Sequence, residues 1–325
     1  MAAPDLKTLL APAQPEMQAV DALIVRRLAS PVPTVNELSS YIIGAGGKRL
    51  RPVSCVLAGL ACGGRGERFH LLAAVIEFIH TATLLHDDVV DGSQLRRGRV
   101  TANSRFGNDL AVLVGDFLYS RAFQLMVELG QMDVMDLLAT ATNVIAEGEV
   151  MQAAARRNPE LTEAHYLEVI RRKTATLFEA ATAGAAMLAG ADAARCNAMR
   201  AYGLHFGTAY QLVDDLLDYT GDTAALGKNV GDDLAQGTPT LPLLYALRTA
   251  PAPVREGLRD TLRAGGTPDL AQVRTAIEST GALAYTRGLA IDHAGRAIEA
   301  LAGLPVSPAR QALEDLARFA VERNH

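Results

Sequence analysis

Cysteine is scarce in this chain, and its scarcity excludes several classes of protein. The 325 residues include only three cysteines, Cys55, Cys62 and Cys196, and their spacing matches no metal site. A disulfide framework is therefore not expected, which fits a reducing cytosol. An excess of positive charge is also lacking. The formal net charge is −5, which argues against a protein that binds nucleic acid.

Signals for export or membrane insertion are lacking too. The N-terminal stretch MAAPDLKTLLAPAQPE has no apolar core of the kind that a signal peptide needs. The longest apolar region, residues 71–85, is interrupted by Glu77 and His80, so we expect no membrane span. These features predict a cytoplasmic protein whose only contact with a membrane is peripheral.

Two-residue alternation of polar and apolar side chains, which marks half-buried strands, is nearly absent. Apolar residues instead recur at three- and four-residue spacing, as in residues 71–85, 110–129 and 213–219. This period predicts an all-α protein of roughly ten or more helices. Clusters of glycine and proline separate the helices, and none has the character of a long linker. We therefore expect one domain over residues 1–325, with helices in residues 255–325 that serve as structural support.

An acidic pattern, DDxxD, occurs twice and carries the strongest chemical signal. The first copy is Asp87, Asp88 and Asp91, and the second, 127 residues later, is Asp214, Asp215 and Asp218. The i, i+4 spacing puts the outer aspartates of each copy on one helix face. Glycine follows each copy, so both should end a helix, where the helix dipole opposes negative charge. Clustered oxygen ligands without histidine or cysteine suit Mg²⁺, which usually shares its coordination with substrate phosphates.

A solvated acidic helix end is the alternative interpretation of each copy. It is disfavoured because both copies are embedded in apolar residues. Basic residues beside the motifs would complete a site for phosphates, which bind arginine forks and lysine charges. These residues are Lys48, Arg51, Arg96, Arg97, Lys173 and Lys228. Taken singly, each is better explained as an ordinary surface charge, and only the positions beside the acidic motifs favour a role in phosphate binding.

Ordered motifs relate the chain to a known family. Residues 44–244 contain, in order, GGKRLRP, EFIHTATLLHDDVVDGSQLRRGRVTAN, LVGDFLYSRAFQ, NVIAEGEV, KTATLFEAA, TAYQLVDDLLDYTGD, LGKNVGDDL and TPTLPLL. This set resembles the trans-type polyprenyl diphosphate synthases, and most closely the bacterial octaprenyl diphosphate synthases. The resemblance implies a single-domain helical bundle of the isoprenoid-synthase type around a central apolar cavity, with its motif-bearing core in residues 34–245.

The resemblance also implies a reaction. An allylic diphosphate, expected to be farnesyl diphosphate, loses its diphosphate to give a carbocation, which the double bond of isopentenyl diphosphate attacks. About three Mg²⁺ ions per site, present with substrate, would act as Lewis acid and charge clamp. No protein base is evident in the sequence, and the resemblance implies that the released diphosphate takes the proton.

Roles for individual residues follow from the matching motifs. Direct metal ligands would be Asp87, Asp91 and Asp214, with Asp88, Asp215 and Asp218 as supporting carboxylates or as ligands through water. The pocket for isopentenyl diphosphate would contain Lys48, Arg51, His80 and Arg97. The allylic diphosphate would meet Arg96, Lys173, Thr174, Gln211 and Lys228, and Lys173 and Thr174 would also stabilise the carbocation. Without the resemblance, His80 would be taken for an ordinary core histidine.

One position departs from the family pattern. Relatives usually carry a lysine in the segment that reads QGTPTLP here, whereas this chain has Thr238. The change removes a positive charge near the allylic diphosphate and the second acidic motif. Either a basic residue from elsewhere substitutes for it, or the allylic substrate binds more weakly.

Product length should depend on the residues just before the first acidic motif. Ala82 and Thr83 are small, whereas short-chain members of the family place aromatic plugs near here. The wall of an apolar tunnel would continue along Ile79, with Met126 and Met135 towards its floor, since methionine adapts to flexible chains. Ordinary core packing is the better explanation for any one of these last three residues. Because Ala82 and Thr83 leave room for a long chain, we predict a product of about forty carbons, with about 45 or 50 as alternatives.

Two other functions stay open at this point. A terpene cyclase shares the first acidic motif but normally replaces the second with an Asn/Ser/Glu pattern. A non-catalytic regulatory subunit would typically have lost acidic residues, and this chain keeps all six aspartates. By resemblance we also expect a homodimer and a product that becomes the side chain of a respiratory quinone such as ubiquinone.

Overall fold

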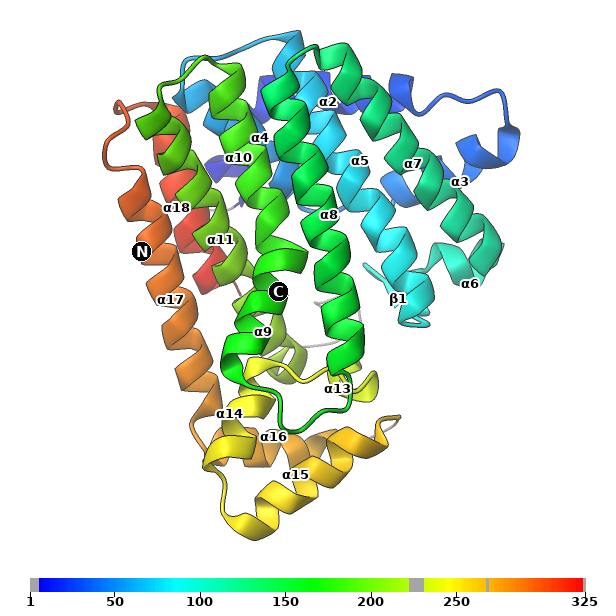
Figure 1. Cartoon of the computed structure of the whole chain (residues 1–325), viewed down its shortest axis with the longest axis vertical. Coiled ribbons are helices and arrows are strands. Elements are labelled where there is room, and N and C mark those ends of the chain that lie inside the picture. The colour runs from blue at the N-terminus through cyan, green and yellow to red at the C-terminus, as the bar shows by residue number, and fades with distance from the viewer. Residues whose placement is uncertain (1–5, 222–230, 267–268, 324–325) are drawn as a thin grey trace.

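The computed structural model describes residues 6–221, 231–266 and 269–323. Within these ranges the chain consists of helices and one short antiparallel hairpin, β1 (Leu95–Arg96) with β2 (Arg99–Val100) (Figure 1). The all-α fold that the periodicity predicted is confirmed. The predicted substrate residue Lys228 lies outside the described residues.

Long helices run side by side along the molecule, and shorter helices cross its lower end (Figure 1). The elements of the first half are α1 (Leu6–Leu9), the 3₁₀ turn η1 (Ala11–Ala13), α2 (Gln14–Arg27), α3 (Pro33–Ile43), α4 (Leu50–Ala61), α5 (Glu67–Val90), α6 (Ala102–Phe106), α7 (Asn108–Leu129) and α8 (Met132–Ala155). Those of the second half are α9 (Glu163–Ile170), the π-helical turn η2 (Arg171–Ala175), α10 (Thr176–Leu188), α11 (Ala193–Thr220), α13 (Asp232–Ala235), α14 (Leu241–Thr249), α15 (Ala252–Ala264), α16 (Leu270–Ser279), α17 (Ala282–Ala300) and α18 (Pro308–Glu322).

Short polar side chains begin several of these helices. Thr162, Asp192 and Ser307 each accept a hydrogen bond from the backbone amide three residues further on, at the starts of α9, α11 and α18. Such caps satisfy one of the amides that a helix leaves unpaired at its start. Gly130, with φ +66°, ends α7 in the left-handed conformation and turns the chain directly into α8.

The core is organised around two helices, α5 and α11. Leu72, Ile76 and Ile79 of α5 are fully buried, and this helix packs against α2, α4, α7 and α10. The first half of α11 joins the same hydrophobic cluster. Its second half joins a second cluster formed with α9 and α14–α17. Because each acidic motif ends one of these helices, both motifs are carried by rigid, buried elements.

Glycines allow η2 to approach its neighbours closely. A Cβ atom at Gly207 of α11 would lie 2.7 Å from the Cα of Ala175, and one at Gly148 of α8 would lie 2.8 Å from the Lys173 amide nitrogen. Neither distance is possible for a real side chain, so only glycine fits at these contacts. The turn that carries Lys173 and Thr174 is therefore held between α8 and α11.

Two helices have the length and hydropathy of a membrane span, α5 and α7. The most apolar window of α5 is 72% buried inside the protein, as expected of a core helix, whereas that of α7 is 39% buried. Both helices pack within the bundle. The structure therefore does not support a membrane span in the described ranges.

Candidate active site

The first acidic motif ends α5, as the sequence predicted. Asp87 and Asp88 lie in its last turn, Asp91 is its C-cap, and Gly92 follows with φ +63°. The unpaired carbonyls of a helix C-terminus carry partial negative charge, so three carboxylates at this end need cations nearby. The geometry shows where those cations come from.

Each of the three predicted direct metal ligands contacts a basic side chain from a distant segment. Lys173 Nζ lies 3.5 Å from Asp87 Oδ2, and Arg323 Nη2 lies 3.5 Å from Asp214 Oδ1. Asp91 forms an ion pair with Arg156. These protein cations sit on the carboxylates that the sequence analysis assigned to Mg²⁺.

Asp88 has a different environment, in keeping with the supporting role predicted for it. Its side chain is fully buried, and its Oδ1 accepts a hydrogen bond from Arg96 Nε at 2.8 Å and forms an ion pair with Arg96 Nη2 at 2.7 Å. Its Oδ2 is buried and has no hydrogen-bond partner within the described ranges. Burial raises the pKa of both Asp88 and Asp91, and neighbouring carboxylates add to the rise. The protein's own cations therefore do not fully compensate this cluster, which leaves it short of positive charge.

The second acidic motif lies in the last two turns of α11. Buried Asp215 accepts hydrogen bonds from Tyr166 Oη at 2.5 Å and from Gln211 Nε2 at 2.7 Å. Thr174 Oγ1 donates to Gln211 Oε1 at 2.9 Å. Asp218 is fully buried and accepts from the Asp233 amide at 3.3 Å. Burial raises the pKa of Asp215, and the negative charge of Asp233 adds to the effect.

Residues of η2 link the two motifs. Lys173 reaches Asp87 of the first motif, and Thr174 reaches Asp215 of the second through Gln211. Lys173 Nζ also donates to Glu149 Oε2 at 2.7 Å and to Gln152 Oε1 at 2.8 Å. Burial and the nearby Asp87 raise the pKa of Glu149 to about 7, despite the ion pair with Lys173.

All four residues predicted to bind isopentenyl diphosphate meet at one small cavity of about 60 Å³. They are Lys48, Arg51, His80 and Arg97, and the hairpin β1–β2 brings Arg97 to a loop that lies far from it in sequence. Arg51 Nη1 lies 3.2 Å from His80 Nε2. Burial and Arg51 hold the pKa of His80 well below its ordinary value, so the imidazole is neutral. A concentration of arginine and lysine around a neutral imidazole suits a diphosphate.

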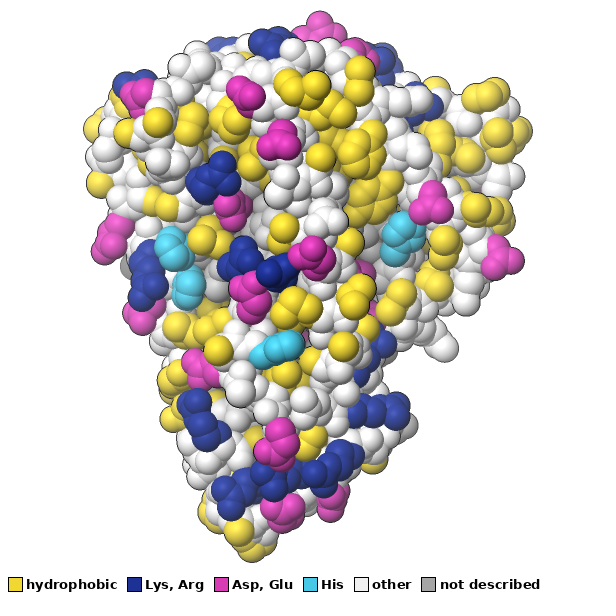
Figure 2. Space-filling model, in the orientation of Figure 1, with side chains coloured by type: hydrophobic (Ala, Val, Ile, Leu, Met, Phe, Trp, Pro, Cys, Tyr) yellow, Lys and Arg dark blue, Asp and Glu magenta, His cyan; other side chains and the backbone are white. Residues whose placement is uncertain are grey.

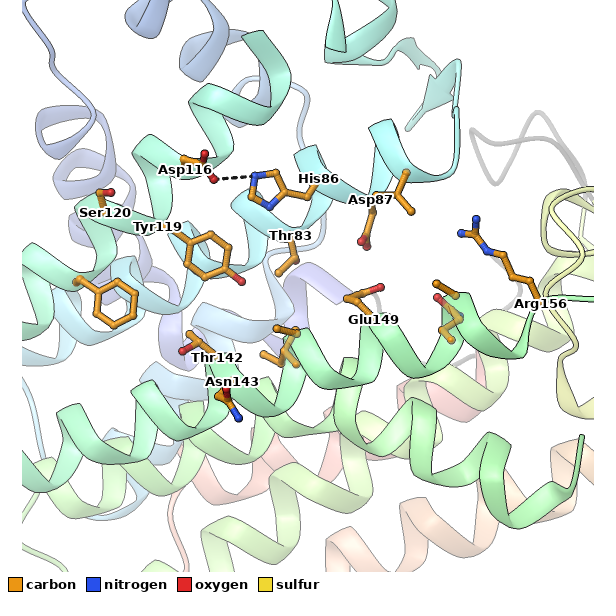
Figure 3. Close-up of a pocket in the computed structure, with 16 residues that line it drawn as sticks. Thr83, His86, Asp87, Asp116, Tyr119, Ser120, Thr142, Asn143, Glu149 and Arg156 are labelled. Carbon is orange, nitrogen blue, oxygen red and sulfur yellow. Dashed lines mark ion pairs between the residues drawn. The ribbon is translucent and has the colours of Figure 1, made fainter. Parts of the chain in front are cut away.

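A larger cavity of about 720 Å³ extends from Asp87 between α5, α7 and α8. Figure 3 shows Asp87 and Glu149 on opposite sides of it, Arg156 at one end, and Ser120, Thr142 and Asn143 at the other. Of the predicted chain-length residues, Thr83 lines this cavity. Ala82, Ile79 and Met126 are buried in the core, and Met135 is partly buried against it. Phe123 also lines the cavity.

Sequence reasoning missed three residues of this site. Glu149 and Arg156 lie on and just after α8, and Arg323 follows the last helix. Arg323 stacks on Tyr210, with its guanidinium carbon 4.0 Å from the ring centre, and donates to the Tyr210 carbonyl at 2.8 Å. The C-terminal helices were expected to be structural support, and the residue that follows them, Arg323, lies 3.5 Å from Asp214 of the second acidic motif. The acidic motif pointed to basic partners in general, but no local signal separates these arginines from surface ones.

The donor set fits Mg²⁺. The described residues contain no group of three His, Cys, Asp or Glu side chains that converges as a ready-made metal site. Mg²⁺ is usually bound by one or two carboxylates together with substrate phosphates, so a preformed cage is not needed. The all-oxygen chemistry, the unpartnered Asp88 Oδ2 and the raised pKa of Asp91 are what a cation completed by its substrate would meet.

Comparisons with known proteins identify the family of this chain. The family model for polyprenyl synthetase matches residues 32–280. The octaprenyl diphosphate synthase of Haemophilus influenzae is 48% identical over 96% of this chain and 95% of its own length. An all-trans-nonaprenyl-diphosphate synthase of Rhodobacter capsulatus, described as geranyl-diphosphate specific, is also 48% identical, over 97% of each chain.

A solved structure shows the same fold. The polyprenyl synthase of Caulobacter crescentus, crystallised with calcium and isoprenyl diphosphate, superposes with a TM-score of 0.96 at 47% identity over the whole of both chains. The chain therefore belongs to the polyprenyl synthetase family and is a prenyltransferase. The fold, the enzyme class and the long-chain synthase function that the sequence predicted are confirmed.

Proposed function

We propose that this chain adds isopentenyl diphosphate units to an allylic diphosphate, such as farnesyl diphosphate, and releases an all-trans product of about forty carbons. The observation that carries the proposal is the position of η2. Lys173 and Thr174 join the two acidic motifs next to a large cavity, because Lys173 contacts Asp87 and Glu149, which line it. A separate small cavity is lined by Lys48, Arg51, His80 and Arg97. This provides two places for diphosphates and one for a growing chain.

Mg²⁺, in about three ions when substrate is bound, would be held by Asp87, Asp91, Asp214 and Asp218, and would stabilise charge on the departing diphosphate. Arg96, Lys173, Gln211 and Lys228 would bind the same diphosphate, and the hydroxyl and carbonyl dipoles at Thr174 and Lys173 would face the carbocation. Lys48, Arg51, His80 and Arg97 would hold isopentenyl diphosphate. The released diphosphate would accept the proton, which fits the absence of a protein base in our assignment.

The product length rests on the large cavity. Thr83, which lines it, is small, and Phe123, Thr142 and Asn143 line it as well. Its volume of about 720 Å³ would accommodate a long prenyl chain. A cytoplasmic location, peripheral membrane contact for product release and a role in making the side chain of ubiquinone or a similar quinone complete the proposal.

We further propose that the protein works as a homodimer through one face of α7. Leu110, Val112, Leu113 and Val127 are exposed on this helix, with Leu113 and Val127 at 61% and 64%. Hydrophobic side chains gather over the upper right of the view in Figure 2, where Figure 1 places α7. An apolar helix face of this kind is typical of a surface that another protein covers.

The deciding experiment incubates the purified protein with Mg²⁺, farnesyl diphosphate and labelled isopentenyl diphosphate, and sizes the dephosphorylated products. We expect one long polyprenol, and a rate lower by roughly a hundredfold or more in Asp87→Ala, because charge stabilisation at the leaving group is lost. Asp260→Ala is the matched control, since Asp260 is an exposed aspartate on α15. It should leave the rate unchanged.

Each competing function predicts a different product pattern. A cyclised hydrocarbon without incorporation of label would indicate a terpene cyclase. No product from a folded protein, with activity only after a second synthase is added, would indicate a regulatory subunit. Either result would refute the proposal.

A further inference from the structure

Arg156 stands at the mouth of the large cavity without a role in any assignment made above. It is the C-cap residue of α8, and its side chain, 26% exposed, pairs with Asp91 across the end of α5. Figure 3 shows it extending from α8 towards the side of the cavity where Asp87 lies. Its Nε is buried and has no hydrogen-bond partner in the described parts of the chain.

That unpartnered nitrogen argues against a purely structural ion pair. A buried N–H group without an acceptor costs about 1–3 kcal/mol, so a guanidinium placed only to join α5 to α8 would be expected to use both of its edges. The fork of an arginine can instead bind two oxygens of one phosphate group. Arg156 therefore has an unused donor at the end of the cavity where Asp87 lies and where the diphosphate of the allylic substrate is expected.

The segment around Arg156 also adjoins the position where the sequence analysis noted a missing charge. The amide of Arg157 donates to the carbonyl oxygen of Gly237 at 2.7 Å, and Thr238 is the next residue. Thr238 lines a small cavity together with Lys173, Thr174, Gln211 and Asp215. A positive charge at residue 156 would thus lie on a segment that contacts the segment of residue 238. Either charge would approach the part of the site around Lys173 and Asp215.

We propose that Arg156 is a binding residue for the diphosphate of the allylic substrate, and that it supplies the positive charge which Thr238 lacks. Asp91 holds the guanidinium in the free protein. When Asp91 serves as a metal ligand, this ion pair is lost and both edges of the guanidinium face the diphosphate. The inference rests on the proposed function, because it names a residue of that substrate site.

The test compares Arg156→Gln, Arg156→Lys and the double variant Arg156→Gln with Thr238→Lys. Calorimetry would measure the dissociation constant of farnesyl thiolodiphosphate, which resists ionisation, in the presence of Mg²⁺. Steady-state assays would give KM for farnesyl diphosphate and for isopentenyl diphosphate separately. Arg157→Gln is the matched control, since it removes the same charge one residue away, where the side chain packs against Gly237 and Gly265.

Arg156→Gln should raise the dissociation constant of the analogue and KM for farnesyl diphosphate by roughly tenfold or more, the scale of one charge-assisted hydrogen bond. KM for isopentenyl diphosphate should stay within about twofold, since its pocket is separate. Thr238→Lys should restore most of the affinity in the double variant. Arg157→Gln should behave as the unaltered protein does.

Two results would overturn the inference. One is an unchanged analogue affinity in Arg156→Gln, and the other is an equal loss for both substrates, which a structural ion pair would produce. Should Arg156→Gln not fold, Arg156→Lys is the deciding variant. Lysine keeps a positive charge that can pair with Asp91, but it lacks the paired N–H donors of the guanidinium. A weaker affinity then supports the inference and an unchanged one refutes it. Failure of the unaltered protein to extend any primer would refute the proposed function, whereas the analogue affinities would still test Arg156.

Discussion

At the scale of single residues, the basic side chains of this site do not fully balance the negative charge of its carboxylates. Burial raises the pKa of Asp88, Asp91 and Glu149, although Arg96, Arg156 and Lys173 lie against them. Desolvation disfavours a charged carboxylate, and like charges nearby increase the effect. The folded protein therefore carries an electrostatic cost that additional cations would relieve. This electrostatic cost is the one expected from the aspartates at the helix ends in the sequence.

The electrostatic cost at Glu149 should be visible in how the free energy of unfolding depends on pH. The folded protein keeps the Glu149 proton up to about pH 7, because its pKa is raised, whereas an unfolded chain loses it near 4.5. Folding therefore takes up a proton in that window, and the contribution of Glu149 to the free energy of unfolding should fall as pH rises from 4.5 to 7. Urea titrations of the metal-free protein should show that Glu149→Gln removes this fall.

The two proteins differ only in this carboxyl group, so any change in pH dependence comes from Glu149 and from the groups that interact with it, such as Lys173 and Asp87. The amide that Glu149→Gln introduces would still accept a hydrogen bond from Lys173, so that contact is retained. If the difference in stability between variant and unaltered protein stays constant from pH 4.5 to 7, the raised pKa assigned to Glu149 is wrong.

At the scale of elements, the site depends on how closely η2 packs between α8 and α11. The π-helical turn places Lys173 towards the first acidic motif and Thr174 towards the second. π-helical turns within helices are frequent at functional sites. The glycines of α8 and α11 set the distance between these helices and η2. A side chain at Gly148 or Gly207 would collide with backbone atoms of η2.

Gly207→Ala should therefore separate α11 from η2. We expect a loss of about 1–3 kcal/mol in the free energy of unfolding, typical of overpacking. The Thr174–Gln211 hydrogen bond should weaken, and the rate of condensation should fall with it. Denaturant titration and the product assay measure the two effects.

Gly295→Ala is the matched control. Gly295 lies within α17, and a Cβ atom there would meet no other atom within 4 Å. Alanine favours helices over glycine by about 1 kcal/mol, so this variant should be as stable as the unaltered protein or more so. Equal behaviour of the two variants would mean that the close approach at Gly207 does not control the site.

At the scale of the whole molecule, the two ends of the chain close around the central helices. The first hydrophobic cluster includes residues of α2 and α18, and Arg323 follows α18 directly into the site beside Asp214. The long helices between them leave an apolar face uncovered on α7. The same helix lines the large cavity, so a partner at that face would adjoin the wall of the cavity.

A homodimer through the α7 face makes a direct prediction about mass. Leu113→Glu combined with Val127→Glu should convert the protein to a monomer, because two buried charges per subunit would oppose association. Light scattering during gel filtration measures the mass, and the circular dichroism spectrum checks the fold. Val306→Glu is the control, since Val306 is 93% exposed in the loop between α17 and α18. A dimer that survives the double substitution would place the interface elsewhere.

The sequence by itself determined the fold class and the enzyme class. Three- and four-residue periodicity requires helices whatever their partners, and the two DDxxD patterns require cations wherever they lie. The resemblance carried by the ordered motifs assigned Lys48, Arg51, His80 and Arg97 to one pocket, and in the structure they line one cavity. Helical periodicity and sequence motifs are properties of short stretches, so they can be recognised without knowledge of the tertiary structure.

Only the tertiary structure decided which charges meet. Arg156 and Arg323 lie 65 and 109 residues from Asp91 and Asp214, and neither stands in a pattern that marks it out. The same holds for Ala82 and Thr83, which are neighbours in sequence but differ in position, one buried in the core and one lining the cavity. Their roles depend on helix rotation and on packing between distant segments, and a sequence pattern specifies neither until the helices are assembled.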